Sequence, residues 1–199
     1  YDADPRDMHR SDVKCIAAFT SLYTEVADND KVARLVKHLT DPAEFAAPYP
    51  CPSISMDTPG FNAKDPTAAG DCLTTTGLWF TVEGLIKHGY TDIASQFVKA
   101  IIGMATKDGI ITASDSYSSI TGQSTRTDNS LTQQGLIIVD LICRYVLGLH
   151  PQSDGTISVD NSPLCDINLE SFTFGPYKFR DKWITVSKRS NNITYNMCE

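Results

Sequence analysis

The sequence lacks the features that mark several large classes of protein. No apolar run approaches the roughly 20 residues that a membrane-spanning helix needs, and the stretch at 136–139 is far too short. Acidic side chains outnumber basic ones, and the resulting net charge of −7 disfavours binding to nucleic acid or to an anionic membrane face. No charged and then apolar leader follows Tyr1, so we expect a mature or processed chain.

Signatures of metal binding are also lacking. The histidines are scattered, and no two cysteines form a C-x-x-C pair, so we expect neither a metal site nor a cofactor. The even number of cysteines leaves two interpretations open: six buried thiols, or two or three disulfides in a secreted protein. The glycosylation sequon at Asn192-Ile193-Thr194 favours secretion to the extracellular space.

What the sequence does contain is a succession of helical patterns. Apolar residues recur at helical spacing over residues 16–26, 32–39, 73–86, 93–105 and about 130–147. Residues 42–70 interrupt the series with six of the chain's ten prolines and cannot form a regular helix. A loop of this length in a compact protein is usually functional or a linker.

Beyond residue 151 the pattern becomes that of strands. Asp154-Gly155 marks a turn, and β-branched and aromatic residues gather at 156–159, 168–174, 177–187 and 193–197. We therefore predict a mainly α protein in which an array of α-hairpins over residues 1–150 precedes a small antiparallel β segment over residues 151–199.

Several short segments, taken in order, resemble a group of known glycosidases. They are Ser21-Leu22-Tyr23-Thr24, the Leu-Thr-Asp-Pro-Ala-Glu-Phe segment at 39–45, Pro52-Ser53-Ile54-Ser55, the Gly-Leu-Ile-Lys-His-Gly-Tyr segment at 84–90, Thr121-Gly122 and Leu147-Gly148-Leu149. Across residues 10–187 the chain resembles the C-terminal half of mannosylglycerate-hydrolase-like, processing-glucosidase-like and trehalase-like six-hairpin enzymes. About five helices are too few to close six hairpins, so the resemblance implies a partial (α/α)6 toroid.

The resemblance implies inverting hydrolysis of O-glycosyl bonds in gluco- or manno-type saccharides. This chemistry needs an acid that protonates the leaving oxygen and a base that activates water. The family's acid lies in the preceding half of the barrel, so we expect a second chain that supplies that half, or self-association. Its base, a glutamate, falls on Asp115 when counted back from Gly122. The simpler interpretation is that Asp115 is a solvated turn residue.

The segment that lines the family's sugar site differs in this chain. Residues 68–74 are Ala-Ala-Gly-Asp-Cys-Leu-Thr, without the family's arginine and aromatic residues, and its later tryptophan appears as Leu131. The side chains still suited to sugar hydroxyls are small and polar, namely Asp71, Thr75, Thr76, Tyr117, Gln123 and Asn129. Ordinary loop solvation is the alternative for each. A catalytically inactive carbohydrate-binding, structural or storage protein is thus the alternative to a hydrolase.

Two further hypotheses concern the cysteines and the tryptophans. A bridge from Cys51 to Cys72 would pin the proline-rich loop, and one from Cys143 to Cys165 would tie the last helix to the β segment, although other pairings exist. We expect Trp79 and Trp183 to be core residues rather than platforms for sugars.

Overall fold

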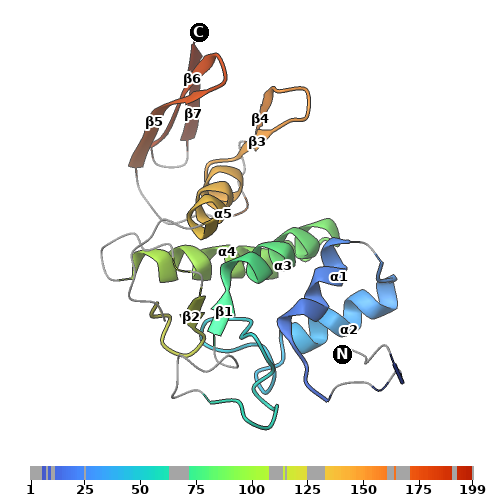
Figure 1. The fold of residues 1–199 in the computed structure, drawn as a ribbon. Helices are drawn as coiled ribbons and strands as arrows, with labels where there is room; N and C mark the ends of the chain where they lie inside the picture. The colour runs from blue at the N-terminus through green and yellow to red at the C-terminus, as the bar shows by residue number, and fades with distance from the viewer. Residues whose placement is uncertain are drawn as a thin grey trace. The chain divides into compact units, whose positions relative to one another are not determined.

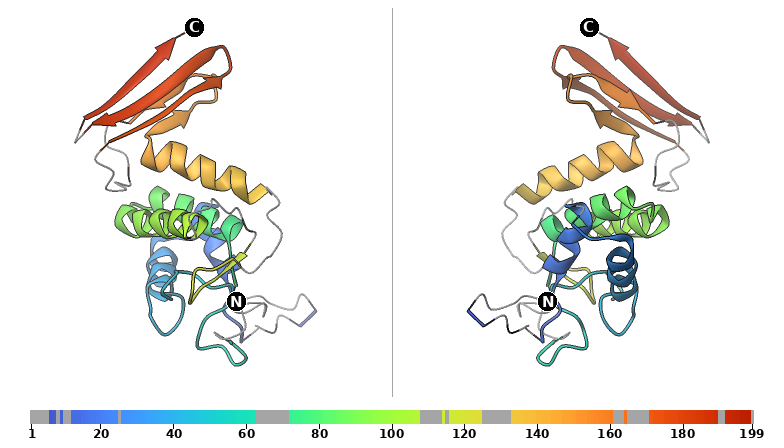
Figure 2. Two further views of the ribbon diagram at one scale, coloured as in Figure 1. Left: turned by 90° about the vertical axis from the view of Figure 1, so that its left-hand side faces the viewer. Right: turned by 90° about the vertical axis from the view of Figure 1, so that its right-hand side faces the viewer.

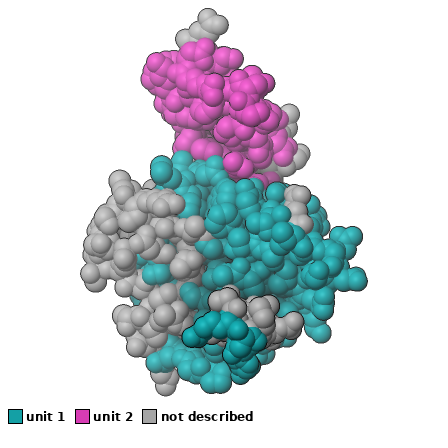
Figure 3. All heavy atoms as spheres, turned by 45° about the vertical axis from the view of Figure 1, so that its right-hand side comes forward, with its two compact units in different colours: residues 1–141 teal, residues 142–199 magenta. Residues whose placement is uncertain are grey.

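The structure, a computed structural model, describes residues 6–7, 9, 12–24, 26–62, 72–107, 114, 116–124, 133–160, 164, 171–189 and 192–198. For residues 72–76 and 133–134 it describes the backbone alone. The chain divides into two compact units, Tyr1–Leu141 and Ile142–Glu199, coloured teal and magenta in Figure 3. No helix in the described part of the chain is long and apolar enough to cross a bilayer.

Unit 1 is helical, as predicted (Figure 1). Its helices are η1 (Ile16–Phe19), which continues directly into α1 (Thr20–Tyr23), then α2 (Asn29–Leu39), α3 (Thr75–Lys87), α4 (Thr91–Thr106) and α5 (Gln133–Leu141). Asp28 caps α2, because its carboxylate accepts a hydrogen bond from the backbone N–H of Lys31 at 2.9 Å. α4 begins at Thr91, and its N-cap residue, Tyr90, makes no side-chain capping hydrogen bond.

Close contact between α1 and α3 forms the centre of unit 1. A Cβ on Gly84 would lie 2.8 Å from the backbone nitrogen of Tyr23, so only glycine permits this approach. Phe19 and Leu22 are fully buried there, and the ring of Phe19 meets Phe45 edge-on with centroids 4.9 Å apart. The core therefore joins the first helices to the proline-rich segment.

Residues 41–62 of the proline-rich segment form turns and bends, as their prolines require. Backbone hydrogen bonds attach the segment to the start of η1, from Ile16 N–H to Ser53 O and from Ser55 N–H to Lys14 O, each 2.9 Å long. Peptide groups thus hold this part of the proline-rich segment against the start of η1.

The predicted disulfides are wrong. Cys51 and Cys143 are both thiols, so neither the bridge to Cys72 nor the bridge to Cys165 is present; Cys165 lies outside the described residues. Cys51 is enclosed by the core, and this burial raises the pKa of its thiol. A buried thiol with a raised pKa behaves as a small apolar side chain.

One pair of short strands in unit 1 was not predicted. β1 (Cys72–Thr74) pairs antiparallel with β2 (Ser116–Ser118), so that Leu73 faces Tyr117 and Thr74 faces Ser116. β1 leads directly into α3 and lies within a segment whose apolar spacing predicted helix from residue 73. Three residues are too few for a strand periodicity to be detected.

Unit 2 is largely a β structure, as predicted. After the π-helical segment η2 (Ile142–Val146), β3 (Leu149–Pro151) pairs with β4 (Ile157–Val159), and a second sheet has the order β5-β6-β7. Those strands, β5 (Ser171–Phe179), β6 (Lys182–Arg189) and β7 (Asn192–Cys198), lie side by side in both views of Figure 2. The core cluster of unit 2 is Leu147, Leu149, Ile184 and Val186.

The two tryptophans differ from each other in burial. Trp79 in α3 is partly buried, lies 5.7 Å from Tyr23 between ring centroids, and donates a hydrogen bond from Nε1 to Asp140 Oδ2 at 3.0 Å. Trp183 in β6 is 43% exposed, so the expectation that it is a core residue is wrong. The alternation of β6 explains this, because Ile184 and Val186 occupy the buried side of the strand.

Candidate functional site

The described members of the predicted site lie in or close to the paired strands β1 and β2. Tyr117 lies in β2, Gln123 in the turn after it, and Thr76 in the first turn of α3, where only the backbone is described. Asp71, Asp115 and Asn129 lie outside the described residues. Since β1 and β2 are paired, the beginning of α3 and the segment from 116 to 124 are neighbours in space.

Hydroxyl groups buried in unit 1 order residues 114 and 116–124, which we call the serine loop. Tyr117 is fully buried, and its hydroxyl accepts a hydrogen bond from the backbone N–H of Ser114 at 3.0 Å. The Ser114 hydroxyl donates to Ser116 O at 2.8 Å, which closes a tight local turn. Because Ser118 and Ser119 are also buried, neutral hydrogen bonds fix the part of this loop around Tyr117.

The Thr121-Gly122 turn of the serine loop lies against Tyr49. Gly122 has φ of +69°, and its N–H donates to Ser118 O at 2.8 Å. A Cβ at this position would collide with the Tyr49 ring, so both the backbone angle and the space require glycine. Tyr49 N–H in turn donates to Ser119 O at 2.8 Å, which joins the proline-rich segment to the loop.

Lys107, at the end of α4, supplies a third anchor for this turn. Its ammonium donates to Thr121 O and, at 3.3 Å, to the Tyr49 hydroxyl, and lies 5.1 Å from the centre of that ring. Two separate segments, the proline-rich segment and the end of α4, thus converge on Thr121-Gly122, the motif from which the position of the predicted base was counted.

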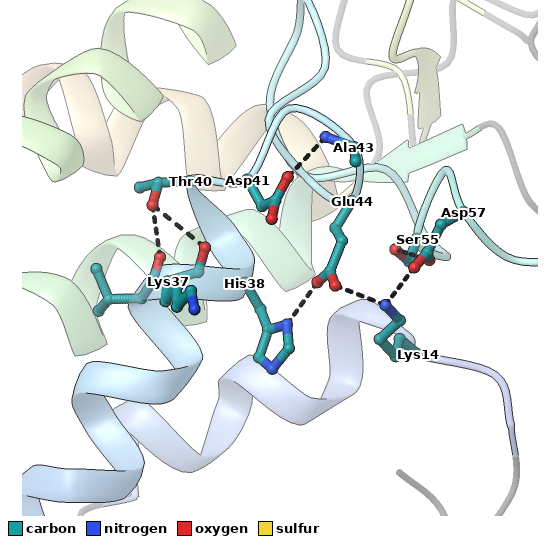
Figure 4. Close-up of polar contacts among 10 residues, drawn as sticks. Lys14, Lys37, His38, Thr40, Asp41, Ala43, Glu44, Ser55 and Asp57 are labelled. Atoms are coloured by element: carbon teal, nitrogen blue, oxygen red, sulfur yellow. Dashed lines mark hydrogen bonds and ion pairs between the residues drawn. The ribbon is translucent and has the colours of Figure 1, made fainter.

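A second polar assembly surrounds Glu44 (Figure 4). The Glu44 carboxylate accepts from Lys14 Nζ at 2.7 Å and lies 2.5 Å from His38 Nδ1. Lys14 also reaches Asp57 at 2.5 Å, and Asp57 accepts from the Ser55 hydroxyl at 2.6 Å. We call these five residues the ionic cluster, and it links η1 and α2 to the proline-rich segment.

The charges of the ionic cluster shift two pKa values in opposite directions. Hydrogen bonds from Lys14 and then from Ser55 lower the pKa of Asp57. Partial burial by itself lowers the pKa of Lys14, but hydrogen bonds to Asp57 and Glu44 together outweigh burial and raise it. Both shifts favour the charged forms, as expected for a network that stabilises its own charges.

The ionic cluster borders a cavity of about 510 Å³ between η1, α1 and α2. Its walls are mostly apolar, with Phe19, Leu35 and Phe45 among them, and its cations are Lys14, Lys31 and Arg34. No carboxylate is among the described residues that line it. Glycoside hydrolysis requires two carboxyl groups, so this cavity is not where such chemistry would occur.

No sequence pattern pointed to Lys14, His38 or Asp57. Glu44 lies within the 39–45 segment that carries the family resemblance, and this was the one available signal. Its partners are 30, 6 and 13 positions away along the chain, with Asp57 reached through Lys14. The described residues contain no cluster of three or more metal-ligating side chains.

A family model described as the mannosylglycerate hydrolase MGH1-like glycoside hydrolase domain matches residues 1–132. The chain belongs to this family. The resemblance noted in the sequence is thereby confirmed, and the family match covers all of the residues that form the serine loop and the ionic cluster.

Relatives of this MGH1-like chain are longer than it. An uncharacterized protein of Borreliella burgdorferi is 28% identical over 97 residues, which are 49% of this chain and 20% of that protein. The chain therefore spans about a fifth of the length of this curated relative.

Solved structures share the fold at low sequence identity. A sialidase has a TM-score of 0.64 and 14% identity over 94% of this chain and 19% of its own. The GH63 mannosylglycerate hydrolase from Thermus thermophilus in complex with glucose has a TM-score of 0.55 and 18% identity, over 65% of this chain and 31% of its own. The same hydrolase in complex with Tris and D-glycerate gives a TM-score of 0.54 and 20% identity, over 64% of this chain and 29% of its own. The MGH1-like chain thus has the fold of part of these larger proteins.

Proposed function

We propose that this chain contributes the base-side half of the active-site bowl of an inverting glycoside hydrolase that acts on gluco- or manno-type saccharides. The observation that carries the proposal is the MGH1-like family match, which covers the serine loop as well as the helices of unit 1 up to α4. Complexes of the Thermus thermophilus hydrolase with glucose and with D-glycerate support a carbohydrate ligand.

In this proposal the helices of unit 1 are part of an (α/α)6 toroid. The chain covers 31% of the hydrolase with glucose bound, so the rest of the bowl would come from further sequence, from a second chain or from a second copy. The general acid would belong to that other part, because the family carries it in the preceding half of the barrel.

Asp115 is the proposed base. It stands between Ser114 and Ser116 in the sequence, six residues before the Thr121 turn that is fixed by Tyr49 and Lys107. Such anchoring suits a base that must hold a water within hydrogen-bond reach. Aspartate is one methylene shorter than the family's glutamate, and a displacement near 1 Å can cost on the order of a hundredfold in rate.

The test is hydrolysis of gluco- and manno-configured disaccharides and of mannosylglycerate by the native protein, with its partner chain if it has one. Asp115→Asn is expected to abolish turnover, whereas Asp115→Glu is expected to raise it by restoring the longer side chain. Asp12→Asn, at an exposed bend, is the matched control and should leave turnover unchanged. Unaltered turnover in Asp115→Asn would rule out Asp115 as the base.

The sequence of residues 68–74 favours a second candidate, a catalytically inactive carbohydrate-binding or structural protein on the same scaffold. The missing arginine and aromatic residues would weaken the hold on a sugar ring. Calorimetric titration with glucose and with D-glycerate separates the candidates. Binding without turnover in wild type supports the inactive protein, and turnover that depends on Asp115 excludes it.

Secretion is part of the proposal as well. Asn192 is exposed at the start of β7, as an acceptor of N-linked glycan must be. Treatment of native protein with a glycosidase that removes N-linked glycans is expected to lower its mass, and the Asn192→Gln variant is expected to show no such change. An unmodified Asn192 in protein from its natural source would count against secretion.

A further inference from the structure

The three-stranded sheet of unit 2 has two faces of different chemistry. Strand alternation places Ile184 and Val186 on the buried face, where both side chains are fully enclosed. The opposite face, here called the outer face, contains Lys178 from β5, Trp183 from β6 and Asn196 from β7, all exposed. The outer face is therefore a surface of the sheet rather than part of its core.

Trp183 is the distinctive side chain of the outer face. It is 43% exposed, and in the described part of unit 2 only Met197 is a comparably exposed large apolar side chain. Its exposure follows from strand alternation, which gives the buried side of β6 to Ile184 and Val186. An exposed indole on the surface of a sheet offers a face on which a pyranose ring can stack.

A cation lies next to this platform. Lys178 is the cross-strand neighbour of Trp183, and its ammonium lies over the indole ring, 5.9 Å from the ring centroid. A sugar that stacked on this face would displace the ammonium toward the edge of the ring, where the flexible lysine side chain would meet the substituents of the sugar. A carboxylate is the substituent that this ammonium would attract most strongly.

The rest of the outer face carries hydrogen-bonding groups, the exposed thiol of Cys198, which lies opposite Trp183 on β7, and one further cation. Thr185 and Asn196 face each other across β6 and β7, and Arg189 stands at the far end of β6. No carboxylate occurs among the described strand residues of this face, although the whole chain has a net charge of −7. The local charge is thus opposite to that of the protein and complementary to an anion.

We propose that the outer face of unit 2 binds an acidic glycan, with a uronic-acid ring stacked on Trp183 and its carboxylate paired with Lys178. This binding site is separate from the hydrolase half-site proposed for unit 1. It requires no catalytic group, so it stands whether or not the chain takes part in hydrolysis.

The test is electrophoresis of the full chain in native gels that contain polygalacturonate, with neutral mannan gels for comparison. Bacterial expression keeps Asn192, which lies on the same face, free of N-linked glycan. Polygalacturonate is expected to retard the wild-type chain, and Trp183→Ala is expected to weaken this binding about tenfold. Trp183→Phe keeps an aromatic face and should bind with intermediate strength.

Two matched controls separate binding from stability. Met197→Ala removes an apolar side chain of similar exposure, 42%, and Lys182→Gln removes an exposed lysine that lies outside the outer face; both should bind as wild type does. Lys178→Gln should lose the preference for polygalacturonate over mannan, and added salt should weaken wild-type binding. Equal retardation of wild type and Trp183→Ala would overturn the proposal, as would wild-type binding to mannan alone.

Discussion

The serine loop and the ionic cluster of unit 1 both hold the proline-rich segment in place, but they do so through different interactions. Both attach the proline-rich segment to the helices, the loop through Tyr49 and the cluster through Glu44. The serine loop is held mainly by buried neutral groups around the fully enclosed Tyr117, and the ammonium of Lys107 contacts it only at the exposed Thr121. The ionic cluster is charged and partly exposed, with the Asp57 side chain 44% exposed. Burial, rather than formal charge, decides which assembly stabilises the unit more.

The serine loop and the ionic cluster should respond differently to pH and salt. The buried neutral bonds around Tyr117 persist over a wide range of pH and salt, which suits a segment proposed to carry a catalytic base. A cluster of solvated charges responds to both conditions. The two assemblies should therefore be distinguishable by mutation, with losses that decrease from the loop to the cluster.

The largest effect is expected for Gly122→Ala in the serine loop. The new Cβ would collide with the Tyr49 ring, and alanine is strained at φ of +69°. Strain and overpacking together predict a loss of about 2–4 kcal/mol in the free energy of unfolding, measured by urea denaturation. The control is Gly103→Ala in α4, which has open space around it and should gain about 0.5–1 kcal/mol. Equal effects at both glycines would show that the turn is not tightly held.

Gly122 also illustrates what the sequence alone could predict. The Thr121-Gly122 motif and the helical periodicity were sufficient to recognise the family and the mainly helical fold, because both depend on residues close together in sequence. Tyr49 and Lys107, which hold that turn, are 73 and 15 positions away from Gly122, and no local pattern connects them to it. Contacts of this kind arise only from the folded chain.

The predictions for the cysteines and for Trp183 were wrong for a different reason. Composition suggests that cysteines pair and that tryptophan is buried, but both tendencies are averages over many proteins. Cys51 is instead enclosed as a thiol by the core, and Trp183 falls on the exposed side of β6 because Ile184 and Val186 take the buried side. The alternation in the sequence shows which residues of β6 share a face of the sheet, but it does not show which face packs against the core.

A smaller loss is expected for Tyr117→Phe. The change removes the acceptor of the Ser114 N–H while keeping the ring, and it leaves that buried donor without this bond. A loss of about 1–2 kcal/mol in the free energy of unfolding is expected, independent of salt. Tyr90→Phe, at a partly exposed position in unit 1, is the control and should change stability by less than about 0.5 kcal/mol.

Glu44→Gln tests the ionic cluster at its centre. Glutamine keeps the shape of the side chain but removes the charge that Lys14 and His38 contact. We expect a loss of about 1 kcal/mol in dilute buffer that shrinks in salt of about 1 M, because these partners are partly solvated. A loss greater than that of Tyr117→Phe, or one insensitive to salt, would reverse the ranking of the two assemblies.

The smallest effect is expected for Asp57→Asn, and it should depend on pH. The pKa of Asp57 is lowered from its ordinary value of 3.8, so the carboxylate contributes stability above that pH and loses it as the pH falls through the lowered value. The pKa of Lys14 is raised from 10.5, so its contribution is present below that pH and is lost at higher pH. Wild type should thus exceed Asp57→Asn in stability by less than about 1 kcal/mol at neutral pH, and this difference should vanish in acid. Denaturation midpoints of both proteins, measured between neutral and acidic pH, give the comparison directly, and a difference that persists in acid would show that Asp57 acts through its shape rather than its charge.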